Sequence, residues 1–276
     1  MTTQAGMQTV LITGAAGKVA SQLRPLLRGV WPRLRLSDRI EPAGLQADEE
    51  FVAAELGDTS QLDAAVAGVD GILHLGGRSG EDDWAVIERD NIAGCHNLFE
   101  AARRHGVQRV VFASSNHAIG FYPRHRRIGT DALARPDSFY GVSKLFGEGL
   151  GALYADKYGL RVMCIRIGNV DSQPVDLRRL SIWISPRDLA QLVRIGLDHP
   201  ALHYAVVWGV SDNERGWWDN ETAWRLGYRP QDRAEDYRDA ALAAQARLPA
   251  DPLGDRMQGG TFCAQHYAGD PERSGS

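Results

Sequence analysis

The sequence predicts an α/β fold in which a parallel sheet is wrapped by helices on both faces. The first observation behind this prediction is a regular alternation of short apolar segments with longer amphipathic ones, which is typical of a doubly wound parallel sheet. The second is a glycine-rich turn between the first expected strand and the first expected helix. The third is a length of 276 residues, which suits one large domain with a substantial core.

Strands and helices can be assigned in order along the chain. The strands are short runs rich in apolar and β-branched residues, and we expect them at residues 8–13, 33–37, 50–53, 71–75, 108–113, 161–165 and 204–208. We expect helices at residues 21–28, 58–67, 83–105, 137–158 and 186–198. Beyond about residue 169 the alternation loosens. We therefore expect one domain over residues 1–276, to which residues from about 169 onward contribute a small C-terminal cap.

The composition narrows the class of partner. The net charge is -4, with 31 basic and 35 acidic residues mixed along the chain, so neither a nucleic acid nor an anionic membrane surface is expected. No apolar run approaches the roughly 20 residues of a membrane-spanning helix. Cys95, Cys164 and Cys263 are an odd set without C-x-x-C spacing, which favours reduced thiols and argues against a metal site. We expect a cytoplasmic protein that binds a small molecule and no metal.

The turn after the first expected strand reads Thr-Gly-Ala-Ala-Gly-Lys-Val-Ala at residues 13–20. Gly14 permits a tight turn and Gly17 lets the backbone approach a pyrophosphate, while the following helix N-terminus supplies free amides and a positive dipole. Ala20 stands where a third glycine is common, and its methyl group still fits between helix and strand. The turn predicts a dinucleotide site in a Rossmann-type fold. The cofactor contacts expected here are Gly14, Ala16, Gly17, Lys18 and Val19.

Asp38 ends the second expected strand, about twenty residues after the turn. Its carboxylate suits the ribose hydroxyls of NAD and would repel the 2′-phosphate of NADP. The neighbouring Arg39 could accept that phosphate, so this alternative stays open. We expect NAD as the cofactor. Further cofactor contacts are expected where the third and fourth strands end, at Leu56, Asp58, Leu75, Gly76 and Gly77.

Tyr140 and Lys144 stand four residues apart in an expected helix. This spacing places the ammonium beside the phenol and favours the phenolate form. Such a base can take the proton of an alcohol as a hydride leaves. Ser115 follows a buried strand and can donate a hydrogen bond to the reacting oxygen. We predict that Tyr140, Lys144 and Ser115 are the catalytic residues, and that Tyr140 and Lys144 also contact the cofactor.

These residues carry a resemblance to a known family. The glycine turn, Asp38, Asn91, Ser115 and the Tyr140 to Lys144 pair resemble the short-chain dehydrogenase superfamily, in its extended epimerase/dehydratase branch. The resemblance implies that Asn91 belongs to the cofactor site. More specific motifs resemble bacterial uronate dehydrogenases within that branch: SSNHAIGFYP at 114–123, ARPD at 134–137, RIG at 166–168, VWG at 207–209, GWWDN at 216–220 and QGGTF at 258–262.

The resemblance implies oxidation of a hexuronic acid, such as D-galacturonate or D-glucuronate, at its anomeric carbon. NAD⁺ would be reduced and an aldaric acid lactone released. Arg178 would bind the uronate carboxylate, because a planar guanidinium grips a carboxylate through two parallel hydrogen bonds. The other implied substrate contacts are Ser79, Ser115, Asn116, His117, Tyr140 and Asn169.

One position departs from the family pattern. Where these enzymes commonly have serine and cysteine after the RIG motif, this chain has Asn169 and Val170, so an amide that donates and accepts replaces a hydroxyl. Two alternatives stay open: a sugar-nucleotide epimerase or dehydratase, which needs a larger C-terminal part, and a non-catalytic dinucleotide sensor, which has no need of the tyrosine and lysine. We also expect a homo-oligomer.

Overall fold

The computed structural model describes residues 6–275, and these contain a seven-stranded sheet in which neighbouring strands are all parallel. The strands are β1 Thr9–Thr13, β2 Arg33–Asp38, β3 Glu49–Ala53, β4 Gly71–His74, β5 Arg109–Ser115, β6 Arg161–Ile167 and β9 Tyr204–Gly209. Their order in the sheet is β3-β2-β1-β4-β5-β6-β9. The predicted doubly wound, Rossmann-type α/β fold is confirmed. Residues 1–5 and 276 of the expected domain lie outside the described residues.

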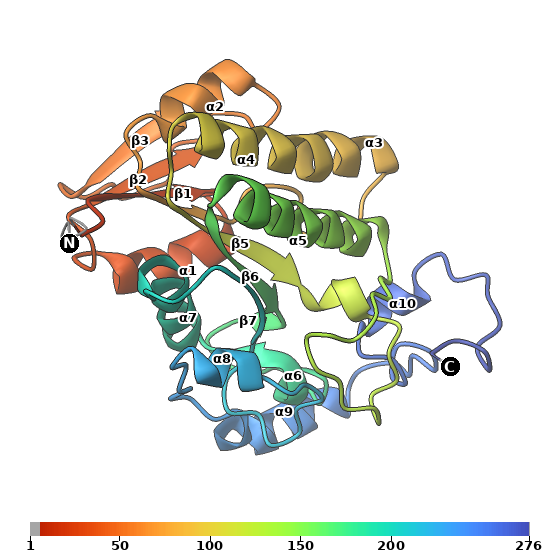
Figure 1. Ribbon diagram of the computed structural model, residues 1–276. Helices are drawn as coiled ribbons and strands as arrows, with labels where there is room; N and C mark the ends of the chain where they lie inside the picture. The colour runs from red at the N-terminus through yellow and green to blue at the C-terminus, as the bar shows by residue number, and fades with distance from the viewer. Residues whose placement is uncertain (1–5, 276) are drawn as a thin grey trace.

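Helices cover both faces of the sheet (Figure 1). Those that do so are α1 Lys18–Leu27, α2 Thr59–Val66, α4 Gly94–Arg104, α5 Phe139–Tyr158 and α7 Pro186–Asp198. On one face α2, α4 and α5 enclose a core that contains Leu62, Phe99 and Tyr154. On the other face α1 and α7 enclose a core that contains Leu23 and Val193.

The two core layers follow from alternation along the strands. In β1, Val10 and Ile12 belong to the layer under α1 and α7, whereas Leu11 belongs to the layer under α2, α4 and α5. All three side chains are fully buried. Because successive side chains of a strand point to opposite faces, a strand covered on both faces must be apolar throughout. This explains the continuous apolar run that predicts β1.

The strand order reverses between β1 and β4, which is where sheets of this kind bind their ligands. The turns that follow these two strands meet there. A Cβ atom on Gly14 would lie 2.8 Å from backbone atoms of Leu75 and Gly76. Gly14 also has a φ of +67°, which only glycine adopts without strain. Position 14 therefore requires glycine both for space and for backbone conformation.

The helix expected at 83–105 is interrupted. It consists of α3 Trp84–Ile87, the π-helical segment η1 Glu88–Ala93, and α4. A single π-helical segment within a helix is often found at a functional site. Here it contains Asn91, whose side chain bonds to a neighbouring loop and to α5. Apolar periodicity predicts the helix but not this interruption, because long-range bonds of Asn91 stabilise it.

The C-terminal part adds short elements at the end of the molecule toward which β5 and β6 point (Figure 1). A second, two-stranded sheet pairs two short parallel strands. The short elements are β7 Asn169–Val170, α6 Arg179–Ile182, β8 Trp183–Ile184, α8 Glu221–Arg225, η3 Ala234–Tyr237, α9 Arg238–Gln245 and α10 Thr261–Ala264. Small buried clusters around Trp208 and Trp218, around Trp183, and around Met257 and Cys263 hold them together.

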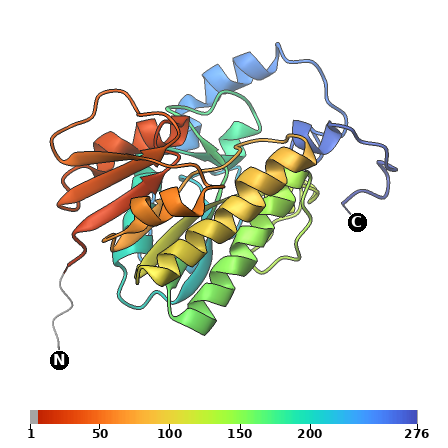
Figure 2. The ribbon, with the colours of Figure 1, turned by 90° about the horizontal axis from the view of Figure 1, so that it is seen from above.

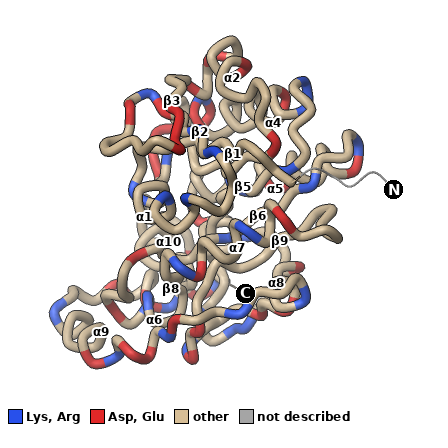
Figure 3. The backbone as a smooth tube through the Cα atoms, turned by 90° about the vertical axis from the view of Figure 1, so that its left-hand side faces the viewer, with Lys and Arg blue, Asp and Glu red and all other residues tan. Residues whose placement is uncertain are grey.

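Basic and acidic residues are interspersed along the backbone (Figure 3). None of the helices within residues 6–275 is long and apolar enough to cross a membrane. Over the same range, no group of three or more His, Cys, Asp or Glu side chains is placed to hold a metal ion.

A buried ion pair joins α5 to β6. Arg166 donates from Nε and Nη2 to the two carboxylate oxygens of Glu148, at 2.8 and 2.9 Å. Ser114 Oγ donates to the same carboxylate at 2.6 Å. The guanidinium also lies 5.2 Å from the centre of the Trp208 ring. Because every charged group of this cluster has partners, the pair holds α5 at a fixed position against β5 and β6.

Glu148→Gln should therefore lower the free energy of unfolding by roughly 3 to 5 kcal/mol, since it leaves the Arg166 charge buried without its counter-ion. Urea denaturation followed by tryptophan fluorescence would measure the change. Glu221→Gln is the matched control, because Glu221 forms an exposed pair with Arg225 at 3.9 Å, and its loss should cost less than about 0.5 kcal/mol. Equal small effects in both variants would show that the buried pair does not hold the helix.

Candidate active site

The turn after β1 leads into a helix whose N-terminus has no side-chain cap. Gly17 is the N-cap of α1 and makes no side-chain cap hydrogen bond. Ala16, Gly17 and Lys18 are exposed, while Val19 packs partly against the core beneath α1. A helix N-terminus with uncapped amides suits a phosphate group. These residues fit the pyrophosphate of a dinucleotide.

Asp38, at the end of β2, is bound to this turn. Its Oδ2 accepts a hydrogen bond from the Ala16 amide at 3.0 Å, and its Oδ1 accepts from the Arg39 amide at 2.7 Å. The Arg39 side chain is exposed. Lys18, the cation within the turn, forms an ion pair with Asp171 at 2.6 Å. Asp38 is thus the side chain that the turn itself orients, which agrees with the expectation of NAD.

Leu75, Gly76 and Gly77 follow β4 and lie beside the turn. The Gly76 amide donates to Thr13 Oγ1 at 3.2 Å, and Gly77 lies against the Asn91 amide group. The two glycine-rich segments therefore form one continuous backbone surface at the switch point between β1 and β4.

Leu56 and Asp58 follow β3. The Leu56 carbonyl accepts a hydrogen bond from Asn97 Nδ2 at 3.0 Å. Asp58 is the N-cap of α2, and its Oδ1 accepts from the amides of Ser60 and Gln61 at 3.0 and 3.1 Å. A hydrogen bond from Ser60 Oγ at 2.7 Å, together with these amide bonds, lowers the pKa of Asp58. One oxygen of Asp58 is engaged in helix capping, a role that the sequence analysis did not assign to it.

Tyr140 and Lys144 lie in the first turns of α5, and both are buried. Lys144 Nζ lies 5.3 Å from the centre of the Tyr140 ring and 5.2 Å from the centre of the Phe112 ring. The ammonium is therefore beside the phenol, as helical spacing requires.

Ser115 ends β5 and caps the short 3₁₀ helix η2 Asn116–Ile119. Its Oγ accepts a hydrogen bond from the His117 amide at 3.2 Å, which leaves its own hydrogen free to donate. A Cβ atom on Gly141 would lie 2.3 Å from the His117 carbonyl oxygen, so η2 and α5 are in direct contact. The rings of His117 and Tyr140 lie 5.8 Å apart. The structure thus brings Ser115, His117 and Tyr140 together.

Asn91 links α5 to the loop after β4. Its Nδ2 donates to Ser143 Oγ at 3.0 Å and to the Arg78 carbonyl at 3.1 Å, while its Oδ1 accepts from the Arg78 amide at 2.7 Å. Ser143 Oγ donates in turn to the Tyr140 carbonyl at 2.7 Å. Both amide atoms are bonded to protein, so Asn91 positions the loop beside Tyr140.

Asn116 and Arg178 contact each other. With its amide oriented to satisfy its neighbours, Asn116 accepts from Arg178 Nη2 at 3.1 Å and donates to the Ile167 carbonyl at 3.2 Å. Arg178 Nε donates to the Gln258 carbonyl at 2.9 Å. Because Asn116 directly follows Ser115, this bond places the guanidinium next to the Ser115, His117 and Tyr140 group.

Arg178 and Arg179 differ in their partners. Within residues 6–275 Arg178 forms no ion pair, whereas Arg179 binds the buried Asp176 carboxylate at 2.5 Å. Burial, aided by repulsion from Arg179 and Arg124 and opposed by the charges of Asp137 and Asp176, lowers the pKa of Arg178 to about 10, so it remains a cation at neutral pH. A desolvated guanidinium without a directly paired carboxylate favours binding of an anion.

Two expected substrate residues are not brought into this group by any side-chain bond. Ser79 is exposed in the loop after β4, next to Gly80, which approaches Phe262. Asn169 is partly buried at the start of β7, where it pairs with Trp183 through the backbone. Their roles toward a substrate stay predictions.

The sequence analysis missed four residues that shape the site. Glu81 accepts hydrogen bonds from the Phe139 and Tyr140 amides at 3.1 and 2.8 Å and so caps α5. Asp137, Gln258 and Phe262 lie against His117 or Arg178, as shown by the bonds and ring contact of these two residues. Motifs at 134–137 and 258–262 contained three of the four, but the contacts join distant segments, and no local spacing predicts them.

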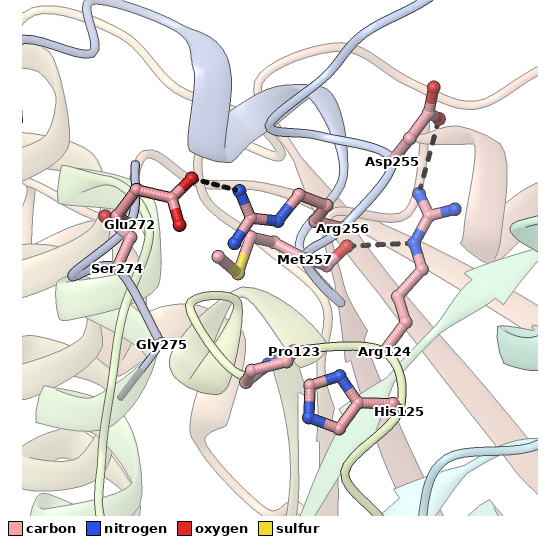
Figure 4. Close-up of a pocket in the computed structure, with 9 residues that line it drawn as sticks. All are labelled: Pro123, Arg124, His125, Asp255, Arg256, Met257, Glu272, Ser274 and Gly275. Carbon is pink, nitrogen blue, oxygen red and sulfur yellow. Dashed lines mark hydrogen bonds and ion pairs between the residues drawn. The ribbon is translucent and has the colours of Figure 1, made fainter. Parts of the chain in front are cut away.

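A cavity of about 470 Å³ lies outside this group, lined by Pro123, Arg124, His125, Asp255, Arg256, Met257, Glu272, Ser274 and Gly275. Figure 4 shows Arg124 reaching the Met257 carbonyl. Its Nε donates there at 3.1 Å and its Nη2 donates to the Gly254 carbonyl at 2.7 Å. Arg124 thereby links the segment that precedes Gln258 to the loop after η2.

Comparison with known proteins agrees with this geometry. A family model described as the NAD dependent epimerase/dehydratase family matches residues 10–198. The chain is 46% identical over 255 residues to a uronate dehydrogenase of Pseudomonas putida, a match that covers 92% of this chain and 94% of that protein. This chain belongs to the uronate dehydrogenase family. The resemblance inferred from the sequence motifs is confirmed.

Solved structures extend the match to the whole fold. A glucuronic acid dehydrogenase from Chromohalobacter salexigens superposes with a TM-score of 0.90 at 42% identity, covering 97% of this chain and 100% of that chain. A variant of the uronate dehydrogenase from Agrobacterium tumefaciens, complexed with NAD, gives a TM-score of 0.89 at 44% identity, covering 94% of this chain and 98% of that chain. The similarity therefore includes the C-terminal elements as well as the sheet.

The geometry of Asp38 predicts a strong preference for NAD⁺ over NADP⁺. Asp38→Ala should lower the ratio of kcat/KM for NAD⁺ over kcat/KM for NADP⁺ by roughly tenfold or more. A charged hydrogen-bond acceptor for the ribose is lost, and a 2′-phosphate is no longer repelled. Glu41→Ala is the control, since it removes an exposed carboxylate from the next loop without touching the turn. Equal use of both cofactors by the unmodified protein would mean that Arg39 decides the preference.

Proposed function

We propose that this chain oxidises hexuronic acids, D-galacturonate or D-glucuronate, at the anomeric carbon with NAD⁺ and releases an aldaric acid lactone. One observation carries the proposal: the Arg178 guanidinium, which forms no ion pair within residues 6–275, is bonded to Asn116, the residue after Ser115. A dehydrogenase site with a fixed cation beside it suits a substrate that carries both an oxidisable hydroxyl and a carboxylate. The names of the relatives, uronate and glucuronic acid dehydrogenases, support the same substrate class.

The chemistry follows from the residues in contact. Bound NAD⁺ supplies the hydride acceptor for C1 of the sugar. Tyr140 takes the proton of the anomeric hydroxyl, and the Lys144 ammonium lies beside its ring, 5.3 Å from the ring centre. Ser115 donates to the reacting oxygen, because its Oγ accepts from the His117 amide and keeps its hydrogen available. Loss of both hydrogens from the C1–OH group turns the cyclic hemiacetal into a lactone.

Arg178 has N–H groups available to bind the carboxylate of the uronate. A guanidinium carries five N–H groups, and Nε and Nη2 each use one, on the Gln258 carbonyl and on Asn116. The remaining N–H groups of Nη1 and Nη2 are adjacent and match the two oxygens of a carboxylate. We further propose that Ser79, Asn116, His117 and Asn169 contact the sugar hydroxyls, with residues from about 169 onward acting as the substrate cap.

Arg178→Ala should reduce kcat/KM for galacturonate by a factor that corresponds to about 1.5 to 3 kcal/mol, the usual scale for a hydrogen bond to a charged group. The decisive measurement is the ratio of kcat/KM for galacturonate over neutral galactose. It should be large in the unmodified protein and collapse in the variant. Arg178→Lys and Arg179→Lys are a matched pair of variants. Each keeps the positive charge, but only Arg178→Lys removes a planar guanidinium from the site.

The outcomes of this comparison separate distinct failures. An unchanged ratio in Arg178→Ala would show that another residue binds the carboxylate. A ratio near one in the unmodified protein would refute the assignment of a uronate as the substrate. An equal effect of both lysine substitutions would mean that the guanidinium geometry plays no part.

We also propose that the protein is a cytoplasmic homo-oligomer. Its three cysteines are free and buried, which suits a reducing compartment. α5 carries an outward stripe of exposed apolar side chains, Phe139, Val142, Phe146 and Leu153, spaced by three, four and seven residues. A helix that is apolar on both faces is usually buried. Figure 2 shows α4 and α5 side by side at the surface, where a second copy of α5 would cover this stripe about a twofold axis.

Sedimentation velocity should find a dimer or a larger assembly at micromolar concentration. Val142→Glu combined with Phe146→Glu should weaken that assembly and raise the fraction of monomer, because two charges would be buried at the interface. Leu248→Glu introduces a charge at an exposed leucine of the C-terminal part and serves as the control. An unmodified protein that sediments as a monomer would rule out the oligomer.

A further inference from the structure

The His117 ring is held in place by three neighbours. Its Nδ1 lies 2.7 Å from Asp137 Oδ2. The ring stacks on Phe262 with centroids 3.8 Å apart and an interplanar angle of 25°, and it meets the edge of Tyr140 at 5.8 Å. Phe262 comes from α10, so elements far apart in the sequence converge on this imidazole. The reaction steps above use only the backbone amide of His117, and its proposed contact with the sugar assigns no role to either ring nitrogen.

The residues around Asp137 fit its carboxylate closely and hold it in one orientation. The side chain is fully buried, and its Oδ1 accepts a hydrogen bond from Ser138 Oγ at 2.7 Å. A Cβ atom on Gly120 or Gly259 would lie 1.8 or 2.0 Å from Oδ2. Glycine is therefore needed on two separate segments to leave room for this one oxygen. The carboxylate cannot turn away from His117 without losing its hydroxyl partner.

This arrangement determines which ring nitrogen carries the hydrogen. An ionised carboxylate accepts hydrogen bonds and cannot donate them, so the hydrogen of the neutral imidazole stays on Nδ1. Nε2 then presents a lone pair. Among the described residues, none forms a hydrogen bond with Nε2. The ring centroids of His117 and Tyr140 lie 5.8 Å apart, so the imidazole that carries this lone pair lies beside the proposed base.

We propose that Asp137 is a positioning residue that holds His117 in the Nδ1–H tautomer, so that Nε2 accepts a hydrogen bond from a hydroxyl of the uronate. The substrate named here rests on the proposed function. Ser115 and Arg178 present donors to the sugar, and His117 thereby adds a fixed acceptor. A fixed acceptor at this point selects for a sugar whose hydroxyl can direct its hydrogen toward Nε2. A side chain that rotates freely would not make this selection.

Asp137→Asn is the sharpest test, because it keeps the shape of the side chain between the two glycines. An amide can face Nδ1 with either its oxygen or its NH₂ group, so the tautomer is no longer determined. KM for galacturonate and glucuronate should rise roughly tenfold while kcat changes little, as expected for loss of a hydrogen bond that substrate and transition state share. The Kd for NAD⁺ and the melting temperature should stay close to those of the unmodified protein.

A double-mutant cycle with His117→Ala separates positioning from packing. In the His117→Ala background, Asp137→Asn should have almost no further effect on KM, since the residue it orients is gone. Asp131→Asn, which removes an exposed carboxylate from the same segment, should change neither constant. Equal effects of Asp137→Asn in both backgrounds, or no effect on KM in the unmodified background, would overturn the proposal.

Nitrogen-15 NMR of histidine-labelled protein reads the tautomer without any turnover, with His117→Ala identifying the resonances. The unmodified protein should show a protonated Nδ1 and an unprotonated Nε2, and Asp137→Asn should lose this pattern. A protonated Nε2 in the unmodified protein would refute the tautomer assignment. If instead the tautomer is as proposed but neither uronate is oxidised, the failure lies with the proposed function, and the role of Asp137 toward a sugar hydroxyl is overturned with it.

Discussion

The close approach of α5 to the sheet is the constraint on which the rest of the site depends. A Cβ atom on Gly147 would lie 2.2 Å from the Phe112 ring, and one on Gly151 would lie 3.0 Å from Val162. Larger residues at these positions would lift the helix away from β5 and β6. Tyr140 would move with it, because it lies on the same rigid helix. Small residues toward the sheet therefore place the proposed base, while Phe139, Val142, Phe146 and Leu153 of α5 face outward.

The same approach connects the sheet to Arg178, the cation proposed to bind the substrate. Arg166, paired with Glu148 beneath α5, lies over Trp208, whose ring stacks on Trp218 at 4.4 Å. Trp218 Nε1 donates to the buried Gln258 side chain at 2.7 Å, and the Gln258 carbonyl accepts from Arg178. Trp208 and Trp218 are thus core residues. A continuous series of packed and bonded groups sets the distance between helix α5 and the guanidinium, which is what a substrate with two distant functional groups requires.

Sequence reasoning succeeded where the signal was local. The alternation of apolar runs predicts each strand of the main sheet to within two residues at either end, and the spacing of Tyr140 and Lys144 predicts their juxtaposition, because a helix fixes that geometry. It failed where residues meet only in the folded chain. Asp137 and Glu81 are ordinary surface carboxylates by composition, and one is buried beside His117 while the other caps α5. The π-helical turn at Asn91 is likewise decided by partners that lie elsewhere in the sequence.

Arg178 and Arg179 show why the fold is needed to assign a charge its role. The two are adjacent and chemically identical, and no local pattern separates them; only the family resemblance points to Arg178. In the structure they begin a short helix and point to different surroundings: Arg179 meets a buried carboxylate, whereas Arg178 meets a carbonyl, an amide and the backbone of Gly260. Burying a cation without a directly paired carboxylate costs free energy, which the charges of Asp137 and Asp176 offset only in part. A bound carboxylate would recover that free energy, so the unpaired Arg178 would add affinity for the proposed anionic substrate.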